Sequence, residues 1–536
     1  MTSRLPLQLL LLILILLASA PPTPVAQAAP AGYAVSGTAL MDPSGSPRFL
    51  IGASYQGPAD RAWQMWADDQ FDLNLIAQDF ARARTAGIGV LRIFVQKPLA
   101  DDLVAGKWQK LDRVLDLADR HGLAIVLTLH DYTDWDLARV AKLDGAVAAR
   151  YRGRATLVAL DLKNEPRIGD LALSVYPPGE AAPLQDAAIV ARIGERVTRD
   201  EIPEYRASEG GQKTVPARLD DEQAYVYVNA LRAYQQLLED SAAWAKATKD
   251  GNVVRYLHSP EAAAWAPLID ALNDSLALWL RPRLAAVRRA DPDRLVTVAQ
   301  VDTILATLPV NAWLDYRTYH RYPSASAAGV KAALNLWDDV RAAVPGRPIV
   351  LGELGISNDA TDEATSAALE LELMRGLRDR GGAGAFKWML NDFPNGANPR
   401  ENSFGMFRAD GSAKPIAAGL RAYAQRTPAS TGALTSVPAA PPVACAGGGP
   451  RPNTRSASTV GRLVVAGTDG QGVVMRKSPH DGERLRAWSD GTRFDQTGSE
   501  VERDGLRWTP VRDPCGTSGW VPMRYAAPAA PDPAAP

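Results

Sequence analysis

Short apolar runs alternate with stretches of helical periodicity between residues 33 and 425. Each run has the length of a strand buried on both faces, which is typical of a parallel sheet. The stretch 107–122 shows the helical pattern, because its apolar residues recur every three or four positions. Eight strands are expected, most with a helix between them: 49–57, 88–96, 123–131, 156–164, 294–302, 315–322, 348–355 and 384–392. This count predicts an α/β fold, a closed (β/α)8 barrel rather than an open doubly wound sheet.

The fourth and fifth strands are separated by an insertion, about residues 167–266, that is far longer than an ordinary connection. Tyr227, Leu231, Tyr234 and Leu238 repeat there at helical spacing. We expect a helical lid or subdomain over the top face of the barrel, with these side chains in its own core.

Polar residues interrupt the apolar runs where the strands end, and active sites of such barrels lie at those carboxyl ends. Two of these residues are carboxylates, Glu165 after the fourth strand and Glu353 in the seventh. Glycosidic cleavage needs such a pair, one protonated and one ionised. A spacing of about 5–5.5 Å between the carboxyls implies retention, and about 6.5–9.5 Å implies inversion. We expect a nearby arginine to hold Glu353 ionised and a less charged pocket to keep Glu165 protonated.

Four strand-end motifs, "DLKNEP", "YHRYP", "VLGELGIS" and "FKWML", resemble in kind and order those of the retaining (β/α)8 glycoside hydrolases of clan A, and cellulase-like family 5 most closely. The resemblance covers about residues 40–425 without the insertion. It implies that Glu165 is the acid/base and Glu353 the nucleophile. It also implies that Asn164 binds the sugar 2-hydroxyl and that Tyr322 and Arg92 orient and charge-stabilise Glu353. His130 and His320 would line the subsite of the reacting sugar, and Trp388 would form its stacking floor.

Composition narrows the function classes. The net charge of −1 argues against electrostatic binding of nucleic acid or an anionic membrane. The chain has five histidines, and no two lie within five positions of each other, so HxH and HExxH metal motifs are missing. Because both reacting groups of a glycosidase are side chains, we expect neither a metal nor an organic cofactor.

The first 28 residues have the pattern of an export signal, with Arg4, a long apolar run and the small-x-small sequence Ala26-Gln27-Ala28. The run is shorter than the ~20 residues that span a bilayer, so cleavage is favoured over anchoring. We expect a secreted protein, extracellular or associated with the cell surface. The only cysteines, Cys445 and Cys515, would form a disulfide in such a compartment, and two free buried thiols are the alternative.

Three further segments follow the barrel. Residues 426–458 are rich in Pro, Ala, Gly, Ser and Thr, as in a linker, and the tail 527–536 has a disordered composition. Residues 459–526 resemble the bacterial SH3-like (SH3b) domain, a small all-β barrel, which would bind a cell-wall component or serve only as a spacer. The matching positions are Arg476, Pro479, Gly491, Thr492, Trp508, Gly519, Trp520 and Val521.

Three functions remain open from the sequence. The first is a retaining hydrolase that cleaves β-linked glucan- or mannan-type oligo- or polysaccharides. The second is a peptidoglycan hydrolase that the SH3-like domain brings to the cell wall. The third is a carbohydrate-binding barrel without catalysis, which loss of either carboxylate would indicate; both are present. We expect the first.

Overall fold

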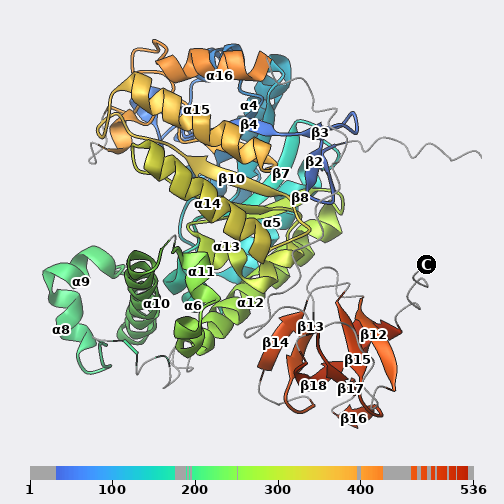
Figure 1. Ribbon diagram of the computed structural model, residues 1–536. Coiled ribbons are helices and arrows are strands. Elements are labelled where there is room, and N and C mark those ends of the chain that lie inside the picture. Colours follow the sequence, from blue (N-terminus) through green and yellow to red (C-terminus); the bar gives the residue numbers. More distant parts are fainter. Residues whose placement is uncertain are drawn as a thin grey trace, which may run out of the picture.

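The computed structural model describes residues 32–175, 189, 192–193, 196–249, 251–394, 400–425, 460–466, 473–479, 484–488, 492–503, 506–514 and 516–528 (Figure 1). The expected export signal, the linker at 426–458, both cysteines and the tail from residue 529 lie outside these ranges. The expectations about them therefore stay predictions.

Eight parallel strands form a closed barrel in the order β10-β11-β4-β5-β6-β7-β8-β9, which confirms the (β/α)8 fold. Every strand falls within a predicted run, because a strand covered on both faces requires continuous apolar sequence. The strands are β4 (Leu50–Tyr55), β5 (Val90–Phe94), β6 (Ala124–Thr128), β7 (Leu157–Asn164), β8 (Leu295–Gln300), β9 (Arg317–His320), β10 (Ile349–Leu354) and β11 (Gly384–Lys387).

Helices surround the barrel, and Figure 1 shows α14 and α15 lying along its outer side. Several begin at an aspartate or serine whose side chain accepts a hydrogen bond from the first turn, such as Asp72, Asp136, Ser326 and Asp362. The helices are α2 (Leu73–Thr85), α3 (Lys97–Val104), α4 (Gln109–His121), α5 (Leu137–Arg150), α12 (Ala266–Ala290), α13 (Thr303–Thr307), α14 (Ala327–Ala343), α15 (Glu363–Asp379) and α16 (Pro415–Gln425), with the 3-10 turns η1 (Ala59–Arg61), η4 (Pro309–Trp313) and η5 (Glu401–Ser403).

A small antiparallel sheet that the sequence patterns did not predict covers the amino-terminal end of the barrel. Its strands are β1 (Ala34–Ser36), β2 (Ala39–Met41) and β3 (Pro47–Arg48). Leu40 is fully buried in a cluster with strand-start residues such as Leu50, Val90 and Val350. This sheet closes the end opposite the candidate site, so it stabilises the barrel and leaves the carboxyl ends of the strands free.

The insertion is helical where it is described, as predicted. Its elements are α6 (Ile168–Val175), α8 (Ile202–Ala207), α9 (Glu209–Thr214), α10 (Asp221–Ala247), α11 (Val253–Leu257) and η3 (Pro260–Trp265). Tyr227 and Tyr234 of α10 are buried, consistent with a core role. The Tyr234 hydroxyl donates to Asp302, two residues beyond β8, at 2.5 Å. The long helix is thereby attached to the carboxyl end of the barrel.

The carboxyl-terminal part is all-β, as expected for this segment. The strands pair antiparallel in the order β14-β13-β18-β17-β15-β12-β19, and β16 pairs with β17. Trp488, Phe494 and Val511 lie in its core. The strands are β12 (Gly461–Val465), β13 (Val473–Arg476), β14 (Arg484–Trp488), β15 (Arg493–Gln496), β16 (Val501–Arg503), β17 (Leu506–Arg512), β18 (Ser518–Pro522) and β19 (Ala526–Pro528). The 3-10 turn η6 (Met523–Tyr525) connects β18 to β19. The last strand extends two residues beyond the predicted boundary at 526.

Among the helices of the described ranges, none is long and apolar enough to cross a membrane.

Candidate active site

The two predicted carboxylates meet at the carboxyl end of the barrel, on either side of one histidine. Glu165 follows β7, Glu353 lies in β10, and His320 is the last residue of β9. The Nδ1 atom of His320 is 2.7 Å from Oε1 of Glu165 and 3.3 Å from Oε2 of Glu353. One side-chain oxygen of each carboxylate and this nitrogen all lie within 4.8 Å of one another. The barrel therefore brings together residues that are 188 positions apart in the chain.

Both oxygens of Glu353 receive a hydrogen bond from a predicted site residue. Arg92 donates from Nη1 to Oε1 at 2.6 Å, and the Tyr322 hydroxyl donates to Oε2 at 2.5 Å. Glu353 is 3% exposed and Arg92 is 1% exposed, so this ion pair is desolvated on both sides. Two fixed donors orient the carboxylate, as an attacking group requires.

Arg92 also binds Asp161, an inward-facing residue of β7 that the sequence analysis did not single out. Its Nε and Nη2 atoms donate to Oδ2 of Asp161 at 3.1 and 2.9 Å. Thr128 of β6 donates to the same oxygen, and the backbone of Ala299 donates to Oδ1. A charged residue inside the apolar run "LVALDLKN" was the available indication, because a buried aspartate needs a partner. The guanidinium is thus fixed from the barrel interior.

Asn164, predicted to bind substrate, lies beside this network. Its Oδ1 accepts from Nη2 of Arg92 at 2.8 Å, and its Nδ2 donates to Asp131 at 3.2 Å. The amide orientation is therefore set by a cation on one side and a carboxylate on the other. Asp131, three residues beyond β6, is a second neighbour that the sequence did not assign to the site.

Glu165 differs from Glu353 in backbone and exposure. Its side chain is 37% exposed, against 4% for Glu353. Its φ is 44°, and Trp63 is the other non-glycine residue with a positive φ in the described ranges. Such conformations are costly for residues with a Cβ and collect at functional sites. The backbone N–H of Glu165 donates to Ala299 of β8 at 2.9 Å, which stabilises this turn.

The pKa values of the pair shift in the directions opposite to those expected from the sequence. Burial raises the pKa of Glu353, and His320 and Arg92 offset this only in part. Burial would also raise the pKa of Glu165, but the hydrogen bond and charge of His320, then Arg92 and Arg167, hold it below its ordinary value. The expectation failed because desolvation of Glu353 outweighs its arginine. Two carboxylates this close titrate as one unit.

Trp388 follows β11 and lies among aromatic side chains. Its ring centroid is 6.2 Å from Phe94 and 6.3 Å from Trp63, whose own ring is 4.3 Å from Phe393. Tyr322 and Phe404 pack with the same cluster. The indole N–H donates to Glu401 at 3.2 Å. Trp388 is only 7% exposed, so any sugar contact is limited to one edge or face of the ring.

His130, another predicted site residue, contacts a buried aspartate of a surrounding helix. Its Nε2 is 2.9 Å from Asp144 of α5, and Arg283 of α12 binds the same carboxylate. A cavity of about 10 Å³ adjoins the ring, room for about one water molecule and too small for a sugar. Among the residues that the structure describes, Nδ1 of His130 and Nη1 of Arg283 have no hydrogen-bond partner. That this histidine lines the sugar subsite stays a prediction. Its Nε2 contacts the buried Asp144, whose charge would otherwise be less compensated.

Glu165, His320 and Glu353 also form the kind of cluster that can hold a metal ion. The surrounding donors do not suit a cation. The Arg92 guanidinium lies 2.6 Å from one oxygen of Glu353 and stays charged, so it would repel a metal. The Tyr322 hydroxyl occupies the other oxygen. These residues fit a carboxylate pair better than a metal centre.

The chain is similar to several solved glycoside hydrolases. One is an exo-β-1,4-mannosidase from Opitutaceae bacterium strain TAV5, at 17% identity and a TM-score of 0.45 over 73% of this chain and 62% of that one. Another is a GH5_18 protein from Streptomyces cattleya in complex with Manβ1-4GlcNAc, at 17% identity and a TM-score of 0.47 over 74% and 83%. A third is a β-glucuronidase from Faecalibacterium prausnitzii, at 14% identity and a TM-score of 0.43 over 74% and 52%.

No protein-family model and no curated protein matches the chain, including its carboxyl-terminal part. The closed eight-stranded barrel establishes the fold.

Proposed function

We propose that this protein is a secreted retaining glycoside hydrolase that cleaves β-linked glucan- or mannan-type glycans. The observation that carries the proposal is the carboxylate pair at the carboxyl end of the barrel, with oxygens of Glu165 and Glu353 within 4.8 Å. Oxygens this close favour the separation of about 5–5.5 Å between carboxyl groups in retaining enzymes over the separation of about 6.5–9.5 Å in inverting ones. The expected export signal supports the secreted location.

Glu353 is the better candidate for the nucleophile. Burial raises the pKa of Glu353, but Arg92 and Tyr322 fix both of its oxygens, and their donors favour the ionised form that attack requires. In the first step, a Glu353 oxygen attacks the anomeric carbon while the bond to the leaving oxygen breaks. The product is a glycosyl ester on Glu353, which water then hydrolyses.

Glu165 is suited to the acid/base role. Its side chain is partly exposed, so it can exchange protons with water and with the departing sugar. The pKa of Glu165 lies below its ordinary value in the free protein, so its protonation during attack depends on Glu353 being ionised, because that negative charge opposes a second one so close by. Glu165 gives that proton to the leaving oxygen and later accepts one from the incoming water.

The test is a substrate screen with aryl β-glucosides and β-mannosides, β-glucan, mannan, xylan and peptidoglycan. We expect hydrolysis of a β-glucan or mannan and a large loss of activity for Glu165→Ala. Glu353→Ala should also lose most activity, and azide should rescue it with α-glycosyl azide as product, because a single displacement inverts the anomeric centre. Glu363→Gln is the matched control, because this residue pairs with Arg408 instead of the site. Cleavage of peptidoglycan alone would favour the wall-lytic alternative. Binding of a glycan without cleavage would contradict the catalytic assignment.

A further inference from the structure

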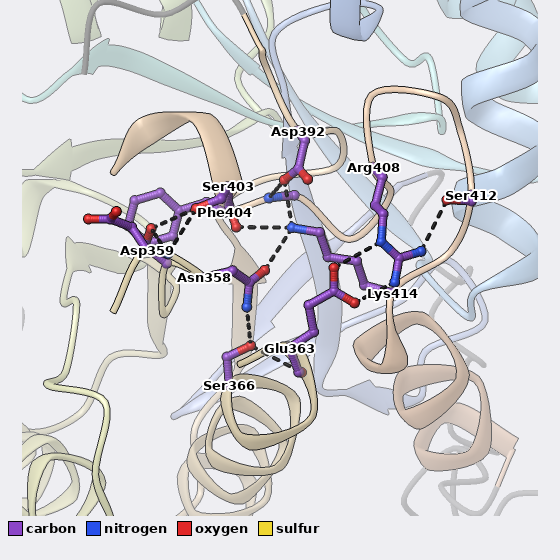
Figure 2. A network of polar contacts seen from close by, with 12 residues as sticks. Asn358, Asp359, Glu363, Ser366, Asp392, Ser403, Phe404, Arg408, Ser412 and Lys414 are labelled. Carbon is purple, nitrogen blue, oxygen red and sulfur yellow. Dashed lines mark hydrogen bonds and ion pairs between the residues drawn. The ribbon is translucent and has the colours of Figure 1, made fainter. Parts of the chain in front are cut away.

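The segment after β11 carries a carboxylate, Glu401, that the sequence analysis did not assign. Glu401 begins the turn η5, which two buried lysines hold in place. Lys414 donates from Nζ to Asn358 and Asp392 at 2.7 Å each, and to the carbonyl of Ser403 at 3.0 Å. Figure 2 shows these contacts converging on the Lys414 ammonium group. The turn is therefore tied to the loop after β10.

A second lysine fixes the same turn from the barrel side. Lys387, the last residue of β11, donates to the carbonyls of Phe404 and Trp388 at 2.6 and 2.7 Å, and its ammonium also pairs with Glu370. Lys387 is 1% exposed. The backbone that carries Glu401 is thus held relative to Trp388 by one buried cation. A group fixed in this way is pre-organised for a ligand.

The Glu401 side chain points at the aromatic part of the site. Its Oε2 accepts from the Trp388 indole at 3.2 Å, and no cation pairs with Glu401 among the described residues. Burial and the charge of Glu353, followed by Glu165 and Glu401, raise the pKa of Tyr322. The charge of Glu401 therefore reaches the hydroxyl that orients Glu353. Its Oε1 has no hydrogen-bond donor in the same described ranges.

We propose that Glu401 binds hydroxyl groups of the sugar that contacts Trp388 and thereby selects neutral hexosides over uronides. The inference rests on the proposed function, which it extends to the substrate class. An ionised carboxylate only accepts hydrogen bonds, so it matches the hydroxyls of a neutral sugar. A uronide would place a second carboxylate beside it, and like charges this close repel.

The experiment compares wild type with Glu401→Gln and the control Glu363→Gln. The glutamine keeps an oxygen for the Trp388 indole but removes the charge. The probes are aryl β-glucoside, aryl β-mannoside, their 4-deoxy and 6-deoxy analogues, and aryl β-glucuronide. Calorimetric binding of cellobiose and mannobiose is measured in parallel. Melting temperatures show that the variants are folded.

A hydrogen bond to a charged group contributes about 1.5–3 kcal/mol, so we expect kcat/KM on the better hexoside to fall ~10- to 100-fold in Glu401→Gln, mainly through KM. Wild type should cleave one deoxy analogue poorly, and Glu401→Gln should lower kcat/KM on that analogue no further. The rate on glucuronide relative to the hexoside should be higher in the variant than in wild type. Equal kinetics of wild type and variant, or equal losses on parent and deoxy substrates, would overturn the inference. If wild type binds cellobiose or mannobiose without cleaving any glycoside, the proposed function fails, and binding then tests the inference by itself. Weaker binding by Glu401→Gln would support the inference, and equal binding would overturn it. Neither binding nor cleavage by wild type would overturn both.

Discussion

Replacing Arg92 by methionine should destabilise the barrel far more than replacing an exposed arginine. Arg92 is 1% exposed and pairs with Asp161 and Glu353, which are 1% and 3% exposed. Methionine fills similar space but leaves both carboxylates without their cation. Removing one partner of a buried ion pair typically costs about 3–5 kcal/mol. We use this range once for Asp161 and Glu353 together, because protonation of one carboxylate removes its uncompensated charge.

The expected change in melting temperature follows from the size of the barrel. Unfolding entropy is about 2.1 cal/mol/K per residue, so a barrel of ~390 residues has about 0.8 kcal/mol/K. A loss of 3–5 kcal/mol then lowers the melting temperature by about 4–6 °C. The control is Arg139→Met, which removes the surface pair with Asp134, where the arginine side chain is 58% exposed. Such pairs contribute less than about 1 kcal/mol, or about 1 °C here.

The stability that Arg92→Met loses should depend on pH. Without Arg92, the pKa of Glu353, already raised by burial, rises further above the ordinary 4.5. At lower pH the carboxyl is neutral in both the folded and the unfolded chain and costs little. As pH rises above 4.5 the unfolded chain ionises first, so stability is lost until the folded-state pKa is passed. Calorimetry at pH 4.5 and 7.5 measures the difference. A melting temperature within 1 °C of wild type at both values would refute the reasoning.

The remaining predictions concern the acid limb of activity and the packing beside Glu353. Burial raises the pKa of Glu353, and the nucleophile must be ionised, so kcat/KM should decline as pH falls through a value above 4.5. Tyr322→Phe removes a donor to the ionised form and should move this decline to higher pH. A pH profile in which the decline moves to lower pH contradicts this. Gly352→Ala would place a Cβ 2.3 Å from the Thr318 side chain and should cost about 1–3 kcal/mol of stability. The control is Gly89→Ala, whose Cβ meets nothing nearer than 3.9 Å. Thermal unfolding compares the two variants, and equal melting temperatures would count against the packing argument.

The sequence by itself determined the barrel and the order of the reactive residues along it. Strands covered on both faces must be apolar, so eight runs were visible, and the polar residues that end them had to gather at one end of a parallel barrel. Glu165, Glu353, Arg92 and Tyr322 could be located for this reason. The amino-terminal sheet was not visible, because strands of two or three residues carry too short a pattern.

Only the tertiary structure decided which partner each polar side chain takes and how the charges balance. His130 belongs to a strand-end motif, yet its ring pairs with Asp144 from a helix, a contact that no spacing in the sequence encodes. Asp161 and Glu401 join the site through side chains of distant elements. Glu353 has its arginine as expected, but its burial outweighs that charge. Desolvation depends on everything packed around a group, and so it appears only when the whole chain is folded.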